Sequence, residues 1–280
     1  MLSRSPKPAL TQKGYQVIVV DYNSQNSLRF ALAGIDVVIS TISGNPQIYL
    51  IDAAVYARVS RFAPSEFEGS PYSRPPGSPL DRGKAAALAR LQHWRQYGLQ
   101  STVFVCGIFY ERFGPGGLAA YGIGAGSGCR GEGDYIMDIR NRKANIPNHN
   151  ASGQFVRICM TSVNDVARFV VAALDLPQWP AELRMCGERL SVSDVVQKGQ
   201  ALRGGPAFQT AVYPSGALQS ELTYARANQD VAWQYRLHHL IATAEGRFDF
   251  GNPNMNLMVP ITTESFSSWL QKVWGPILGT

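Results

Sequence analysis

The 280-residue chain is long enough for one large domain or two small ones with a sizeable core, and its hydrophobic fraction of 45% is ordinary for a globular protein. Its net charge of +6 comes from scattered lysines and arginines rather than from a basic block, which argues against direct nucleic-acid binding. No apolar run approaches the roughly 20 residues of a membrane-spanning helix, so no membrane association is predicted.

The first residues and the cysteines indicate the cellular compartment in which the protein is expected. The opening stretch, MLSRSPKPAL, lacks the apolar segment of a secretory signal, so we expect a cytoplasmic protein. The four cysteines include no CxxC pair, and neither a metal site nor a disulfide is predicted. Cys106, Cys159 and Cys186 lie in apolar, strand-like runs, where reduced cysteine behaves as a small hydrophobe.

The first part of the chain alternates apolar strands with helices. The predicted strands are a strand end at LSRS (2–5), then GYQVIVVDY (14–22), IDVVISTIS (35–43), RFAPS (61–65) and LQSTVFVCGIF (99–109). The predicted helices cover 26–34, 45–60 and 78–98. This order predicts an α/β fold with a doubly wound parallel sheet, in which the run 14–22 is a strand buried on both faces.

After residue 110 the pattern changes. A glycine-rich stretch, 113–133, predicts a long loop with a short helix, and 146–177 predicts a strand followed by a helix capped near Asn164. Ser191 and Thr263 are predicted caps of further helices. These elements predict a second, smaller region.

A parallel sheet of this kind commonly has a dinucleotide-binding turn, because ligands of open parallel sheets bind at the carboxyl ends of the strands. GSGCRG (126–131) matches G-x-G-x-x-G literally, but it follows no buried strand and precedes no apolar helix, so we interpret it as a flexible loop. Arg4, just past the strand end at 2–5, would suit the 2′-phosphate of NADP. A frayed basic terminus is the alternative.

Three longer motifs occur in one order and at suitable spacing. They are GYQVIVVDYNSQNSLRFALAGIDVVISTIS from Gly14, QIYLIDAAVYARVSRFAPSEFEG from Gln47, and VNDVARFVVAALDLP from Val163. With these motifs the chain resembles the NmrA-like and isoflavone-reductase-like family of atypical short-chain dehydrogenase/reductases. The resemblance covers roughly residues 2–190 well and the remainder more loosely.

The resemblance implies a division of labour along the chain. Residues 1–110 plus about 155–176 would form a Rossmann-type NAD(P)-binding domain, and 111–280 a mainly substrate-binding α+β region. NADPH is the implied cofactor. Family members begin with a strand and a glycine-rich turn, so we expect this chain to be a shortened member. A sheet without that strand would have two unpaired edges.

The resemblance also implies cofactor contacts. Residues in the matching positions are Ser3 and Arg4 by the adenosine 2′-phosphate, Asp21 and Tyr22 by the adenine, Thr41, Ile42 and Ser43 along the cofactor, and Pro64, Ser65, Glu66 and Phe67 beside the nicotinamide. Gly107, Ile108, Phe109 and Tyr110 are predicted to form a substrate wall or core, and His149 to lie near a substrate entrance. Glu66 and Glu68 are candidate general acids, with loop caps or ion-pair partners as the alternative.

Lys84 is the candidate catalytic residue. None of the tyrosines has a lysine four residues on, so the tyrosine–lysine pair of conventional short-chain dehydrogenases is absent from the sequence. The isoflavone-reductase-like branch instead uses one lysine at the start of the helix after PSEF, and Lys84 in SPLDRGKAAALARL matches that place. An ammonium there could stabilise or protonate a substrate oxygen during hydride transfer. The alternative is a solvated lysine on a surface helix.

Together these observations predict an NADPH-dependent reductase of a small, aromatic or polyketide-like secondary metabolite. The alternatives are a dinucleotide-sensing regulatory protein that binds a protein partner without turnover, and an inactive shortened relative. A homodimer is compatible with each of them.

Overall fold

A computed structural model describes residues 1–214 and 216–279, which divide into two compact units. Unit 1 comprises Met1–Glu66, Asp81–Val103 and Leu176–Glu182. Unit 2 comprises Phe67–Leu80, Phe104–Asp175 and Leu183–Thr280. This division follows compactness, whereas the functional boundary expected at residue 110 stays a prediction.

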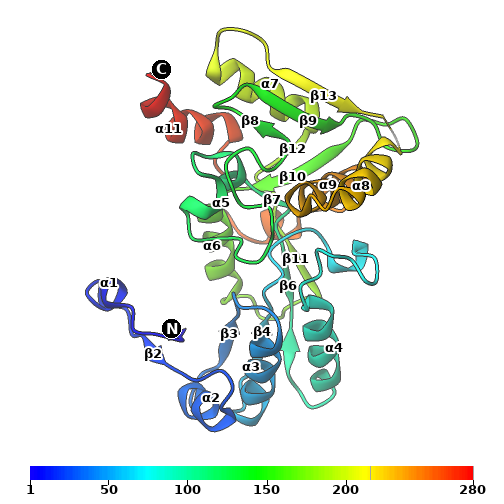
Figure 1. The fold of residues 1–280 in the computed structure, drawn as a ribbon. Coiled ribbons are helices and arrows are strands. Elements are labelled where there is room, and N and C mark those ends of the chain that lie inside the picture. The colour runs from blue at the N-terminus through cyan, green and yellow to red at the C-terminus, as the bar shows by residue number, and fades with distance from the viewer. Residues whose placement is uncertain (215, 280) are drawn as a thin grey trace. The chain divides into compact units, whose positions relative to one another are not determined.

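Unit 1 contains short strands that alternate with helices (Figure 1). Its elements are β1 Leu2–Ser3, α1 Pro8–Thr11, β2 Ile18–Val19, α2 Gln25–Leu32, β3 Val37–Ile39, α3 Asn45–Tyr56, β4 Arg61–Ala63, α4 Lys84–Arg95 and β5 Gln100–Ser101. Two further strands begin in unit 1 and end in unit 2, namely β6 Val103–Val105 and β11 Glu182–Arg184. The alternation confirms the predicted order of elements.

The pairing inside unit 1 is parallel throughout. β1 pairs with β2, with Leu2 opposite Ile18. β3, β4 and β5 form a separate sheet in that order, and Phe62 of β4 lies opposite both Val38 and Ser101. Among the described strands β1 and β3 do not pair with each other, so each has an open edge. The two unpaired edges expected from the sequence are therefore present.

The prediction of a long strand over 14–22 is wrong in both length and burial. Only Ile18–Val19 is a strand, and Val19 is 50% exposed. Successive side chains of a strand point to opposite faces. Ile18 and Val20 therefore pack with the core around Leu28, and Val19 projects from the uncovered face. The apolar run 14–22 predicted a strand with two buried faces, but β2 is buried on one face only.

The helices of unit 1 are fixed by caps and by a shared apolar core. The Ser24 hydroxyl accepts a hydrogen bond from Ser27 N at 3.2 Å and starts α2. α3 packs against both α2 and α4 (Figure 1). The core residues between the helices and the β3–β4–β5 sheet include Leu28, Ile51 and Phe62. Unit 1 thus has its own hydrophobic core.

Unit 2 holds the remaining elements. They are η1 Pro71–Ser73, β7 Ile108–Phe109, η2 Tyr110–Phe113, α5 Gly117–Ala120, β8 Met137–Asp138, β9 Lys143–Pro147, β10 Arg157–Thr161, α6 Val163–Ala173, β12 Glu188–Ser191, α7 Val192–Arg203, β13 Gln209–Tyr213, α8 Ala217–Ala227, α9 Val231–Ala244, α10 Asn254–Met258 and α11 Phe266–Leu278. Two mixed sheets occur, in the orders β12-β10-β7 and β13-β9-β8. Their core is rich in aromatic side chains such as Tyr110, Phe266 and Trp274.

The predicted helix caps of unit 2 are partly confirmed. Ser191 caps α7 in a reciprocal pair of hydrogen bonds with Asp194. The cap of α6 is Ser162 rather than Asn164, and the cap of α11 is Ser265 rather than Thr263. In both corrections the serine lies three residues before the backbone N–H that it accepts from, which is the spacing that a cap requires.

The predicted strand over 99–109 is broken into β5, β6 and β7. Gly107 causes one break, because its φ of 68° lies in the left-handed region. A Cβ there would also lie 2.0 Å from the carbonyl oxygen of Cys159, so only glycine fits. GSGCRG (126–131) lies in a loop, as predicted, and a Cβ on Gly128 would meet the ring of Tyr235 at 2.4 Å.

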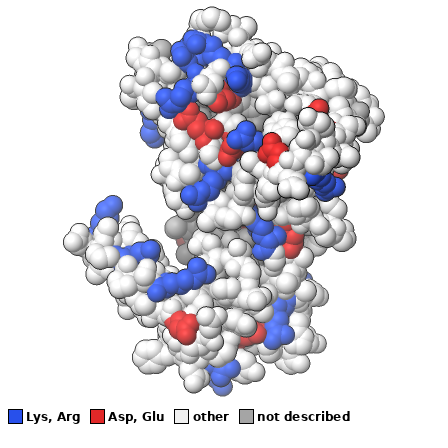
Figure 2. All heavy atoms as spheres, viewed as in Figure 1, with Lys and Arg blue, Asp and Glu red and all other residues white. Residues whose placement is uncertain are grey.

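The surface charges are scattered, as the sequence predicted. On the face shown in Figure 2, basic and acidic side chains are interspersed and uncharged residues separate them. Within residues 1–214 and 216–279, no helix has the length and apolar character needed to cross a membrane.

A buried carboxyl group connects η2 to the start of α6. Both oxygens of Glu111 accept from Val163 N, at 3.0 and 3.1 Å, and the residue is 3% exposed. Burial raises the pKa of Glu111 from 4.5 to about 7, although the hydrogen bond from Val163 opposes the shift. The folded state therefore holds a proton that the unfolded state has already lost, and the free energy of unfolding decreases as pH rises from about 4.5 to about 7.

We predict that Glu111→Gln removes this pH dependence, because an amide does not titrate but still accepts from Val163. Relative to the parent, the variant should gain up to about 3 kcal/mol of unfolding free energy between pH 4.5 and pH 8. Urea denaturation across this pH range measures the difference. Glu245→Gln, at an exposed position, is the control with the same change of charge. Parallel pH profiles for parent and Glu111→Gln would contradict the prediction.

Candidate functional site

The candidate site lies at the carboxyl ends of β3 and β4 in unit 1. Ser40 N donates to Ala63 O at 2.8 Å and carries the parallel pairing past the end of both strands. The loop after β3 contains Thr41, Ile42 and Ser43, of which Thr41 and Ser43 are exposed. The turn after β4 contains Pro64, Ser65 and Glu66. The predicted residues of unit 1 that follow these two strands are therefore neighbours.

A buried ion pair connects the second of these turns to α4. The Nζ of Lys84 donates to the backbone oxygen of Glu66 at 2.9 Å and lies 3.7 Å from its carboxylate Oε2. Lys84 is 3% exposed and Glu66 is 1% exposed. A buried charge is costly unless it is paired, and each member of this ion pair supplies the opposite charge that the other needs. Lys84 is thus not a solvated surface lysine.

The start of α4 places this lysine. The predicted helix begins at residue 78, but the observed one begins at Lys84, after Gly83 at its N-cap. The Asp81 carboxylate accepts from Gly83 N at 3.1 Å and from Ala85 N at 3.0 Å. Gly83 has a φ of 79°, and a Cβ there would lie 3.3 Å from the Cα of Gly44. The start of α4 at Gly83 therefore lies beside Gly44, in the loop after β3.

Gln47 is a site residue that the sequence reasoning missed. It lies in the first turn of α3, is fully buried, and its Oε1 accepts from Ser65 N at 2.7 Å. Its Nε2 is buried without a hydrogen-bond partner among the described residues. The signal was present as the glutamine that opens the Q–x–x–L–I–D–A–A motif. Gln47 therefore positions the turn that contains Glu66.

The predicted adenosine end lies where β1 and β2 finish. The guanidinium of Arg4 lies 5.6 Å from the centre of the Tyr22 ring, and Tyr22 is 7% exposed. Burial raises the pKa of the Tyr22 phenol, and the positive charge of Arg4 opposes that rise. Asp21 accepts from Asn23 N at 2.9 Å, and the Ser3 hydroxyl accepts from Ser5 N at 3.4 Å. These residues form a small cationic and aromatic corner.

The predicted substrate wall lies in unit 2 and is mostly buried. Ile108 is 2% exposed, and Tyr110 is fully buried, with its hydroxyl donating to Glu264 O at 3.2 Å. Burial raises the pKa of Tyr110 far above its ordinary value. Phe109 is half-buried, and the ring of Phe67 stacks on Phe104 at 5.8 Å. Roles for these residues in binding stay predictions, as does the wall that includes Gly107.

The second acidic residue of the SEFEG stretch has a structural partner. Arg74 Nη2 donates to Glu68 Oε1 at 3.1 Å, and Arg247 Nη2 lies 3.7 Å from the same oxygen. All three residues belong to unit 2. Glu68 is therefore an ion-pair partner of Arg74 and Arg247, which was the alternative to a general acid.

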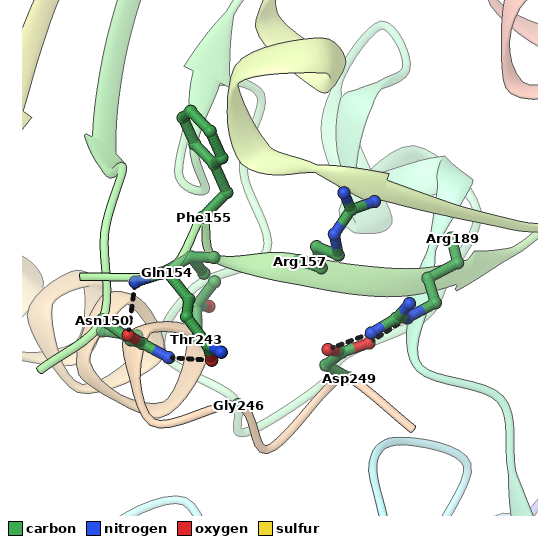
Figure 3. A pocket seen from close by; sticks show the side chains of 10 residues that line it. Asn150, Gln154, Phe155, Arg157, Arg189, Thr243, Gly246 and Asp249 are labelled. Carbon is green, nitrogen blue, oxygen red and sulfur yellow. Dashed lines mark hydrogen bonds and ion pairs between the residues drawn. The ribbon is translucent and has the colours of Figure 1, made fainter. Parts of the chain in front are cut away.

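His149 lies beside a cavity of unit 2 that has a volume of about 370 Å³. Tyr213 and Glu245 also line that cavity. A second cavity, of about 430 Å³, was not foreseen from the sequence (Figure 3). Its polar lining includes Gln154 and the ion pair in which Arg189 donates to both oxygens of Asp249, at 2.6 and 2.8 Å.

Known proteins resemble this chain in sequence and in fold. The NmrA-like family matches residues 4–206. Oxidoreductase BOA1 of Botryotinia fuckeliana (strain B05.10) is 30% identical over 220 residues, which cover 73% of this chain and 67% of that protein.

Two solved structures extend the likeness over most of the chain. One comes from work on pinoresinol-lariciresinol and phenylcoumaran benzylic ether reductases, with a TM-score of 0.72, 20% identity, and coverage of 95% of this chain and 84% of that one. The other is AtPrR2 with NADP⁺ and (+)-pinoresinol, with a TM-score of 0.69, 19% identity, and the same two coverages, 95% and 84%. The Rossmann-type α/β fold class is confirmed.

We predict that Gln47→Leu loosens the turn after β4, because Ser65 N loses its acceptor. The free energy of unfolding should decrease by about 1 to 2 kcal/mol, in the range for leaving one buried donor unpaired. The amide of Ser65 should also exchange faster with deuterium. Denaturant titration and hydrogen exchange measure the two effects. Gln92→Leu on the exposed side of α4 is the control, and equal behaviour of the two variants would refute a positioning role.

Proposed function

Because the chain belongs to the NmrA-like family, we propose that it is an NADPH-dependent reductase of a small aromatic or polyketide-like molecule. One observation carries the proposal: a buried ammonium, that of Lys84, lies at the carboxyl edge of a parallel sheet, where ligands of such sheets bind. The oxidoreductase name of the relative from Botryotinia fuckeliana supports the reaction class.

The residues of unit 1 fit the two ends of a dinucleotide. Arg4 supplies a cation and Tyr22 an aromatic face, which suit a 2′-phosphate and an adenine. Gln47 supplies a buried amide donor with no partner among the described residues beside the Ser65–Glu66 turn. Thr41 and Ser43 supply exposed hydroxyls in the loop after β3. The complex of AtPrR2 with NADP⁺ supports NADPH rather than another cofactor.

Lys84 is the proposed catalytic residue. NADPH, when bound, supplies the hydride that reduces the substrate carbon. Negative charge then develops on the substrate oxygen, and an ammonium nearby stabilises it or donates a proton to it. The carboxylate and carbonyl of Glu66 hold the Lys84 ammonium in one place. An ammonium held in advance costs less reorganisation during the reaction than a mobile surface lysine would.

The proposed substrate class rests on the relatives. AtPrR2 was solved with the aromatic compound (+)-pinoresinol. The specific substrate is set by loops that vary freely within a fold, so we propose the class alone.

We predict that Lys84→Ala reduces kcat by at least about 100-fold, the lower range for loss of a general acid, and leaves the Kd for NADPH within about threefold. NADPH oxidation with a panel of aromatic ketones, enones and quinones measures turnover, and calorimetry measures binding. Lys272→Ala, at an exposed position of α11, should behave as the parent.

A folding check accompanies this test, because Lys84→Ala leaves the Glu66 carboxylate buried without its lysine. The double variant Lys84→Met/Glu66→Gln removes both charges and keeps the volume, so it should fold and remain inactive. Parental turnover in either folded variant would rule out catalysis by Lys84. NADPH binding without turnover by the parent itself, on every substrate of the panel, would favour the dinucleotide-sensing alternative.

We predict that Arg4→Ala weakens NADPH binding by about tenfold or more, as expected for the loss of one charge-assisted hydrogen bond. NADH binding should change by less than about twofold, because NADH has no 2′-phosphate. Paired calorimetric titrations of both cofactors measure the ratio, with Lys13→Ala as a control for the net charge of the same segment. An equal loss for NADPH and NADH would show that Arg4 does not select the phosphate.

A further inference from the structure

The cavity of about 430 Å³ in unit 2 is lined by three segments that are far apart in the sequence (Figure 3). One wall is the turn at 150–156, and another is the end of α9 with the turn that follows it, 243–249. The third wall is the β10–β12 pair, which contributes Arg157 and Arg189. A cavity of this volume lies within the range of small-molecule sites, roughly 300 to 1,000 Å³.

Hydrogen bonds within the turn at 150–156 fix the first wall. The side-chain oxygen of Asn150 accepts from Ser152 N and from Gln154 N, both at 3.0 Å. Asn150 N donates to Gln154 O at 2.9 Å. Val156 N donates to Asn148 O at 3.0 Å and continues this pairing. The first wall is therefore a short hairpin with a defined shape, and binding sites for small molecules are usually preformed in this way.

The opposite wall is fixed by the turn after α9. Gly246 N donates to Thr243 O at 3.0 Å, and Asp249 N donates to Gly246 O at 3.0 Å. The Asp249 carboxylate accepts two hydrogen bonds from Arg189, at 2.6 and 2.8 Å. The Thr243 hydroxyl donates to His239 O at 2.7 Å, so its proton is already used inside the protein.

Arg157 carries the charge of the cavity that no protein group neutralises. It lies opposite Ser191 in the β10–β12 register. Arg189 lies opposite Cys159 in the same register, so the two arginines are on one face of the strand pair. Asp249 neutralises Arg189, whereas the exposed guanidinium of Arg157 has no hydrogen bond or ion pair within residues 1–214 and 216–279. The lining residues therefore have one net positive charge, from two arginines and one aspartate.

An amide and an aromatic ring line the cavity together with Arg157 (Figure 3). The Oε1 of Gln154 accepts from the side chain of Asn150 at 3.5 Å, which leaves the Nε2 of Gln154 as a donor without a partner in the described part of the chain. The ring of Phe155 is 58% exposed, and its centre lies 4.8 Å from that of His149. A cation, an amide donor and an apolar ring thus border one space.

We propose that this cavity binds a small organic carboxylate, which pairs with Arg157 and places its apolar part against Phe155. A guanidinium matches a carboxylate through two parallel hydrogen bonds, and the Nε2 of Gln154 supplies a further donor. One net positive charge suits a singly charged ligand better than a nucleotide with several phosphates. The cavity shares no lining residue with the site around Lys84, so the proposal does not rest on reductase activity.

The test is a titration of the ¹⁵N-labelled chain with benzoate, followed by NMR at low ionic strength, because salt screens the charge of an exposed arginine. Benzoate should bind saturably with a Kd of roughly 1 mM and shift the amide signals of Gln154, Phe155 and Gly246. Benzamide has the same size without the charge and should bind at least about tenfold more weakly. Inorganic phosphate lacks the ring and should also bind more weakly. An affinity for phosphate equal to that for benzoate would overturn the assignment to carboxylates.

Variants assign the binding to the two side chains. Arg157→Gln should weaken benzoate binding by at least about tenfold. Arg226→Gln, at an exposed position of α8, is the matched control and should bind as the parent does. Phe155→Ala should weaken benzoate binding by roughly threefold to tenfold and leave acetate binding unchanged. The amide spectra also show whether each variant is folded.

One further variant separates this cavity from the proposed catalytic ammonium. Lys84→Met/Glu66→Gln should bind benzoate with the parental Kd, because neither residue lines the cavity. Loss of benzoate binding in this double variant would place the ligand elsewhere and overturn the proposal. So would parental affinity in folded Arg157→Gln, or the absence of saturable binding to the parent at concentrations about tenfold above the expected Kd.

Discussion

The arrangement of unit 1 depends on one buried ammonium. Lys84 has to be paired, because removing one partner of a buried ion pair costs roughly 3 to 5 kcal/mol. Glu66 provides that partner through both its backbone oxygen and its carboxylate. The pair joins the turn after β4 to the first residue of α4. The ammonium proposed to act in catalysis therefore also joins two elements of unit 1.

The surrounding groups fix this joint from two sides. The Asp81 carboxylate accepts from the backbone N–H groups of Gly83 and Ala85 at the start of α4, and Gln47 accepts from the backbone N–H of Ser65. Gly83 allows the start of α4 to approach Gly44 closely. Positioning in this site thus comes from backbone geometry and short polar contacts, which suit a group that must stay still during a reaction.

The sequence predicted the kinds of element better than their ends. α2 and α3 were foreseen because the apolar spacing at both helices, and Pro46 in the first turn of α3, agree with a helix. The start of α4 was missed because Ser78 followed by Pro79 also has the pattern of a helix start. The exposure of Val19 was missed because an apolar run does not reveal how many faces of its sheet are covered.

The site shows the same limit. Lys84 was found through a family motif, and its burial could not be inferred from a helix with charged neighbours. Gln47 begins one of the family motifs, yet its partner Ser65 is 18 positions away, and only the fold brings the two residues together. Local sequence patterns do not show which distant segments contact each other in the fold.

The open edge of β3 has a consequence for the behaviour of the protein at high concentration. An unpaired strand edge is a template on which another chain can add a strand. β3 has three residues and β1 has two, so an added strand would gain few backbone hydrogen bonds at either edge. Short edges of this kind make strand addition between copies weak. Growth of fibrils from these edges is therefore disfavoured by length alone, without a proline or an inward-pointing charge to block it.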